Sequence, residues 1–159
     1  APGINAIAAA VLTLATLTGC GSEGPNTPPG ATATFSISAR FVPVRCDLAN
    51  CPTELPVAIA VRVMELGGIM GGYVTTMDLV MRDTASGSIL GSERYDAAEI
   101  ASMTLLESNQ VYPRSWVEIV PHPFRVAGGE GRTRTVTVAI TVTDYHGNEH
   151  RETLTMPIV

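Results

Sequence analysis

The sequence has little charge and no cluster of basic residues. Charged residues make up 16% of its 159 residues, and the formal net charge is −5. The closest approach to a basic cluster is Arg132 and Arg134, two isolated charges on one predicted strand. A nucleic-acid-binding protein needs a basic stripe that neutralises phosphates, and a polybasic membrane patch needs several adjacent cations. The composition therefore excludes both of these binding modes.

Familiar catalytic and cofactor motifs are also missing. No serine stands in a GxSxG frame, and no glycine-rich phosphate loop is followed by a lysine. Cys46 and Cys51 enclose four residues, so they do not form the CxxC of a thiol-exchange site. Asp96 and Glu99 have the spacing of a helix capping box rather than of a facing acid and base. We therefore expect no enzymatic activity and no cofactor.

The longest apolar stretch lies near the start of the chain. Residues 4–18 contain only apolar or small side chains and no charge. A membrane-spanning helix needs about 20 apolar residues, so this run is too short to cross a bilayer comfortably. Its length is typical of the apolar region of a secretory signal peptide. The alternative is a buried apolar helix.

The four residues Leu17-Thr18-Gly19-Cys20 directly follow this run and resemble the lipobox of bacterial lipoproteins. The resemblance implies that residues 1–19 are removed and that Cys20 carries diacylglycerol, with acyl chains such as palmitate holding the protein on the membrane. Two or three acyl chains anchor a protein stably, whereas one does so only marginally. No Lys or Arg precedes the run and the chain begins at Ala, so we expect the basic part of the signal to lie upstream.

Residues 20–33 are predicted to be a flexible tether, because residues 21–34 are rich in Gly and Pro and have no hydrophobic period. The lipoprotein resemblance implies an extracytoplasmic location. In a host with two membranes it favours the outer one, since Gly21 and Ser22 stand where an Asp marks inner-membrane retention. In such an oxidising compartment the remaining pair, Cys46 and Cys51, is expected to form a disulfide.

The rest of the chain, residues 34–159, has the period of two that is typical of β-strands. Apolar residues alternate with polar ones over residues 35–41, 57–63, 73–81, 136–142 and 154–158. On the third of these stretches Tyr73, Thr75 and Met77 are predicted to share one face. Asp96 to Met103 is the only helix-like segment. About seven short strands separated by turn signals predict an all-β, antiparallel β-sandwich.

The last hairpin can be predicted in more detail. Val142 and Leu154 are both expected to face inward, which requires a loop of odd length between their strands. His146-Gly147-Asn148 supplies three such residues. Residues 133–159 resemble the closing hairpin of immunoglobulin-like and fibronectin-type-III-like bacterial surface domains, and this resemblance implies an immunoglobulin-like sandwich.

Two sets of residues are candidates for binding. The loops 66–73 and 109–116 carry Tyr73, Tyr112 and Trp116, which can present flat apolar area to a partner, although packing at the core or rim is the simpler alternative. His146 and His150 flank a turn, where a divalent metal is conceivable.

The methionines add a copper alternative. Met70, in the sequence GGIMGGY, is expected to be the one exposed methionine, whereas the others are expected to fill the core.

Two hypotheses follow from these patterns. The first is a lipid-anchored, non-enzymatic binding or structural module of the cell envelope. It is held to the membrane through Cys20, and its partner is an envelope protein or a glycan. The second is a periplasmic copper-binding protein that uses Met70 with His146 or His150.

Overall fold

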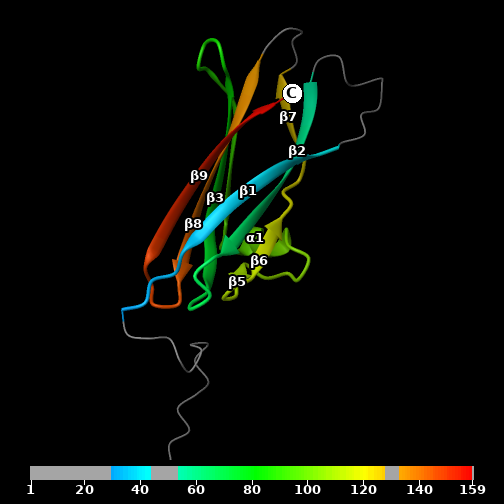
Figure 1. Ribbon diagram of the computed structural model, residues 1–159. Coiled ribbons are helices and arrows are strands. Elements are labelled where there is room, and N and C mark those ends of the chain that lie inside the picture. The colour runs from blue at the N-terminus through cyan, green and yellow to red at the C-terminus, as the bar shows by residue number, and fades with distance from the viewer. Residues whose placement is uncertain (1–29, 44–53, 128–132, 159) are drawn as a thin grey trace, which may run out of the picture.

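Two antiparallel β-sheets pack face to face in the computed structural model, which describes residues 30–43, 54–127 and 133–158 (Figure 1). The first sheet contains β1 (Phe35–Val42), β2 (Glu54–Glu65), β6 (Trp116–Ile119) and β7 (Phe124–Ala127). The second contains β4 (Ile89–Asp96), β3 (Gly72–Asp83), β8 (Arg134–Asp144) and β9 (Glu149–Ile158) in that order, and β5 (Gln110–Val111) pairs with the start of β3. The predicted all-β sandwich is confirmed. The described residues contain nine strands, rather than about seven. The period of two does not reveal β4, which is mostly exposed, or the short strands β5, β6 and β7.

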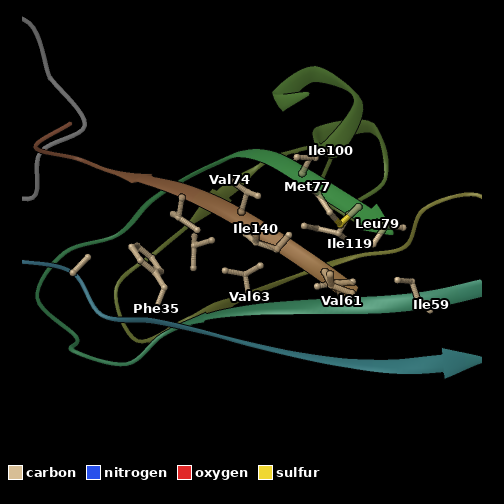
Figure 2. Close-up of a cluster of buried hydrophobic side chains, with 14 of the residues drawn as sticks. Phe35, Ile59, Val61, Val63, Val74, Met77, Leu79, Ile100, Ile119 and Ile140 are labelled. Atoms are coloured by element: carbon tan, nitrogen blue, oxygen red, sulfur yellow. The ribbon is translucent and has the colours of Figure 1, made fainter. Parts of the chain in front are cut away.

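The core lies between the sheets and is built from the alternating residues. Val57, Ile59, Val61 and Val63 of β2 are at most 4% exposed, and they face Leu79 and Ile140 of the other sheet. Figure 2 shows how these side chains point toward one another from β2, β3 and β8. Burying such branched and aliphatic side chains is the main favourable contribution to folding.

One part of the predicted β3 pattern is wrong. Val74, not Tyr73 or Thr75, faces the core, and its side chain is fully buried. The pairing of β3 with β8 is irregular between Val74 and Thr76, where a bulge adds one residue to β3. A bulge reverses the inward and outward alternation, so the pattern holds from Met77 onward but not before it.

The single described helix, α1 (Ala97–Ser102), confirms the predicted capping box. The Asp96 carboxylate accepts hydrogen bonds from the amides of Ala98 and Glu99, both at 2.9 Å. The Glu99 carboxylate in turn accepts from the Asp96 amide at 2.9 Å. Among the described residues, no helix is long and apolar enough to cross a membrane.

The β8–β9 hairpin has the predicted odd loop, displaced by one residue. The Asp144 amide donates to the Asn148 carbonyl oxygen at 2.9 Å, so the loop is residues 145–147 rather than residues 146–148. Gly147 has φ +86°, a left-handed conformation that glycine adopts without steric cost.

Several expectations concern residues that the structure does not describe. Cys20 and the preceding signal segment, most of the tether, and both Cys46 and Cys51 lie outside the described ranges.

Candidate functional site

Both predicted binding loops lie at one end of the sandwich. This end, which we call the entry end, is where residue 30 leads into β1, and it is formed by residues 66–71, 109–115 and 145–148. Figure 1 shows the β2–β3 connection, β5 and the β8–β9 hairpin gathered there, with the turn after β3 and the C-terminal end of β9 at the opposite end. Segments distant in sequence therefore share one surface.

Glu65 holds the entry end together. Its side chain lies at the last position of β2 and the residue is only 3% exposed. The carboxylate accepts hydrogen bonds from the amides of Gly67 at 2.8 Å and Gly68 at 2.7 Å. It also accepts from the amides of Arg114 at 3.0 Å and Thr34 at 3.5 Å. One buried carboxylate thus ties together the β2–β3 connection, the segment before β6 and the residue before β1.

Gly71, at the end of the first loop, is a point of close backbone contact. A Cβ atom at this position would overlap the carbonyl oxygen of Val111 and the hydroxyl of Tyr145. The Tyr145 amide donates to the Gly71 carbonyl oxygen at 3.2 Å, and its hydroxyl accepts from the Gln110 side chain at 2.7 Å. Burial raises the pKa of the Tyr145 hydroxyl, and the hydrogen bond from Gln110 offsets only part of that rise. The β8–β9 hairpin is therefore packed against both loops.

Asp144 organises the hairpin itself. Its side chain is fully buried and accepts hydrogen bonds from the amides of His146 and Asn148, both at 2.9 Å. The Nε2 atom of His150 lies 2.9 Å from its other oxygen, and the His150 ring meets Phe35 edge to face with centroids 5.3 Å apart. Burial raises the pKa of Asp144, but the bonds from His150, Asn148 and His146 outweigh it and lower the pKa to about 2. The carboxylate is thus ionised at neutral pH and can only accept hydrogen bonds, so the Nε2–H group of His150 is the donor of the bond between them.

The residues of the copper hypothesis are not arranged as expected. Met70 is fully buried in the hydrophobic core, so the prediction of an exposed Met70 is wrong. Flanking glycines are typical of an exposed loop, but Gly71 lets the segment approach β5 and Tyr145 closely, and Met70 is buried beside it. His150 is engaged by Asp144, whereas His146 is exposed. Within residues 30–43, 54–127 and 133–158, no group of three or more His, Cys, Asp or Glu side chains could hold a metal ion.

The three candidate aromatic residues differ in exposure. Tyr73 is half-buried and packs against Tyr145 with ring centroids 5.6 Å apart. Tyr112 is 56% exposed and Trp116 is 53% exposed, so neither side chain is packed in the core. The Arg62 guanidinium lies 4.1 Å from the Trp116 ring centroid, which supports the exposed indole from one side.

Large aliphatic side chains are also exposed near these loops. Leu66 is 56% exposed and Ile69 is 49% exposed, on the connection that Glu65 holds in place. Leu105 and Leu106 are 97% and 81% exposed, on the segment between α1 and β5. The sequence pattern identifies the first loop as a candidate but misses this leucine pair. The available signal was that the two leucines are adjacent and belong to no stretch with a period of two.

The turn that carries the leucine pair is well ordered by hydrogen bonds. The Ser108 amide donates to the Thr104 hydroxyl at 2.9 Å, and the Glu107 amide donates to the Thr104 carbonyl oxygen at 3.2 Å. Glu107 has φ +51°, a conformation that a non-glycine residue adopts only when its surroundings hold it. Leu105 and Leu106 are therefore presented by an ordered turn.

No protein-family model matches the sequence, and no curated protein matches it. Among solved structures, a Northeast Structural Genomics Consortium target named SoR45 is similar, with a TM-score of 0.53 and 7% identity over 79% of this chain and 83% of that one. A Bordetella pertussis protein provisionally designated ApaA is similar with a TM-score of 0.55 and 13% identity over 80% of this chain and 93% of that one. Likeness at this level of identity establishes the sandwich fold alone.

Proposed function

We propose that this chain is a lipid-anchored protein of the bacterial cell envelope, in which residues 34–159 form a non-enzymatic binding or structural module. The observation that carries the proposal is Leu17-Thr18-Gly19-Cys20 directly after an uncharged apolar run. The proposal assigns residues 1–19 to a removed signal and residues 20–33 to the lipidated cysteine and its tether. The start of β1 at Phe35 supports the boundary at residue 34.

The entry end supports a binding or structural role better than a catalytic one. Its buried carboxylates, Glu65 and Asp144, are occupied in accepting hydrogen bonds from backbone amides and from His150. Groups used in this way make the loops rigid, and neither carboxylate is turned toward solvent as a general base must be toward its substrate. A rigid loop end with exposed apolar side chains is what a recognition surface requires.

The proposal places the domain in an oxidising compartment of the envelope, where a disulfide between Cys46 and Cys51 is expected. Maleimide labelling of the denatured protein, with and without prior reduction, tests this pairing. We expect two thiols to react only after reduction, whereas two reactive thiols in the unreduced protein contradict the disulfide.

The anchor is tested by labelling cells with radioactive palmitate. We expect the wild-type chain to incorporate label and to sediment with the envelope, and Cys20→Ala to lose both properties. The Cys46→Ala/Cys51→Ala double variant is the matched control, because it removes two thiols and leaves the lipobox intact. Continued labelling of Cys20→Ala contradicts the proposal.

A further inference from the structure

The entry end exposes apolar side chains at the point where the chain leaves the sandwich toward Cys20. The Leu66 amide donates to the carbonyl oxygen of Thr34 at 2.8 Å, so the first exposed loop touches the residue just before β1. Leu66 and Ile69 stand on this loop, and Tyr112 stands on the neighbouring segment that the Glu65 carboxylate joins to it. These three side chains are each about half exposed.

The leucine pair extends this surface. Asn109, which directly follows the 104–108 turn, bonds to Val74 with both its backbone and its side chain, at 2.8 and 3.0 Å. Figure 1 shows α1 and the segment after it in the same half of the molecule as β5. Leu105 and Leu106 therefore lie on the flank of the entry end. We call Leu66, Ile69, Leu105, Leu106 and Tyr112 together the apolar contact set.

The tether restricts where this surface can be. Ten peptide steps separate Cys20 from Gly30, and a fully extended chain of that length spans at most about 35 Å. The 12-residue strand β3 is itself about 40 Å long. With a lipid at Cys20, the entry end lies within about 35 Å of the anchor, whereas the opposite end can lie up to about 75 Å from it.

The charge of the two loops fits a bilayer surface better than the charge of the whole chain does. The net charge of the chain is −5, yet residues 66–71 carry no charge and residues 109–115 carry only Arg114. Glu65, directly before the first loop, is buried and bonded to amides, so the nearest exposed carboxylate to the second loop is Glu107, which follows the leucine pair. The exposed parts of these two loops are therefore uncharged or cationic, a combination that suits the headgroup region of a membrane.

We propose that the entry end rests on the lipid bilayer, with the apolar contact set lying among the headgroups and upper acyl chains. This inference rests on the lipid anchor proposed at Cys20. The anchor limits the distance of the domain from the membrane, and the apolar contact set determines its orientation. The face of the domain that is open to envelope partners is then the opposite end, with the turn after β3.

Trp116 is the single tryptophan of the chain and reports on this contact. It directly follows Ser115, whose carbonyl oxygen accepts from the Glu65 amide at 3.0 Å, so the indole lies beside the entry end. The experiment uses the mature lipidated protein in vesicles of phosphatidylethanolamine and phosphatidylglycerol that contain a headgroup spin-labelled lipid. Quenching of Trp116 emission is measured for the wild type, for Leu66→Asp/Ile69→Asp and for Ile89→Asp.

Ile89 is the matched control, because it is 58% exposed but lies at the start of β4, at the opposite end of the sandwich. We expect clear quenching in the wild type and in Ile89→Asp. The quenched fraction should be at least about twofold smaller in Leu66→Asp/Ile69→Asp, because a charged aspartate is unfavourable next to the acyl chains and keeps the loop out of the bilayer. Thermal unfolding of all three proteins in detergent checks that they are folded. If Leu66→Asp/Ile69→Asp is not folded, Leu66→Ser/Ile69→Ser is used in its place.

The outcomes separate the anchor from the docking. Absence of palmitate labelling in the wild-type protein contradicts both the anchor and the docking, because the docking depends on the anchor. A labelled wild-type protein whose Trp116 is not quenched, or equal quenching in all three proteins, overturns the docking alone. Concentration-dependent dimerisation that Leu66→Asp/Ile69→Asp abolishes, in the absence of quenching, assigns the surface to a second copy of the chain and also overturns it.

Discussion

Two buried carboxylates shape the entry end, and they differ in how far they reach. Asp144 accepts hydrogen bonds from residues two, four and six positions further along its own hairpin. Glu65 accepts from amides two and three positions ahead, but also from residues 31 and 49 positions away. Asp144 therefore closes one local turn, whereas Glu65 joins three separate segments. The comparison shows that similar burial can serve local structure in one case and tertiary structure in the other.

Replacing Glu65 with alanine is expected to have the largest effect. The change leaves the amides of Gly67, Gly68 and Arg114 without their buried acceptor, and we expect a loss of about 3 kcal/mol in the free energy of unfolding. Denaturant unfolding followed by Trp116 emission measures it. Glu93→Ala, on the exposed strand β4, is the control and should change stability by less than about 0.5 kcal/mol. Similar losses in the two variants would show that Glu65 does not join the segments.

Replacing Asp144 with alanine is expected to cost less, about 2 kcal/mol, because the hairpin amides that it releases can turn toward water. The matched control is Glu149→Ala, an exposed carboxylate of the same hairpin. Amide hydrogen exchange sharpens the contrast with Glu65. Asp144→Ala should speed exchange only within the β8–β9 hairpin, whereas Glu65→Ala should speed it in all three segments of the entry end. Exchange that spreads equally in both variants contradicts a local role for Asp144.

A methyl group at Gly71 tests how tightly the hairpin packs on the loops. Gly71→Ala forces its Cβ against Val111 and Tyr145, and such overpacking costs about 1.5 kcal/mol. A Cβ atom at Gly91, in contrast, meets nothing within 4 Å. Gly91→Ala is therefore expected to leave the thermal midpoint unchanged or to raise it slightly. An unchanged midpoint for Gly71→Ala would mean that the hairpin and the loops separate readily.

Acid titration tests the Asp144 carboxylate through its pKa. The pKa of Asp144 is about 2 in the folded protein against an ordinary 3.8, so the folded state prefers the ionised form. Its contribution to stability is complete above pH 3.8 and is lost as the pH falls toward 2. Unfolding measured across this window should depend less steeply on pH in Asp144→Asn than in the wild type. Identical slopes contradict the lowered pKa.

Much of the fold followed from local patterns in the sequence. The period of two located β1, β2, β8 and β9, and the Asp96–Glu99 spacing located α1 and its capping box. Such features depend on residues a few positions apart, so the sequence displays them directly. The turn at Gly147 belongs to the same class, and its predicted position was one residue out.

The predictions that were wrong concern residues whose burial depends on a segment distant in sequence. The bulge in β3 that turns Val74 inward is set by pairing with β8, more than 60 residues later. Met70 is buried because Gly71 allows close contact with β5 and with Tyr145. No periodicity within GGIMGGY contains that information, since a glycine-rich segment reads equally well as an exposed loop.

The sequence by itself determined that this protein is an all-β sandwich, because alternation of apolar and polar residues specifies which face of each strand is buried. It also supplied the lipobox-like segment on which the proposed anchor depends. Only the tertiary structure decided that loops 66–73 and 109–116 meet at the entry end, that Glu65 joins them, and that the five side chains of the apolar contact set stay exposed. The physical reason is that exposure and long-range hydrogen bonding depend on which segments the folded chain brings together. Local periodicity does not specify these contacts.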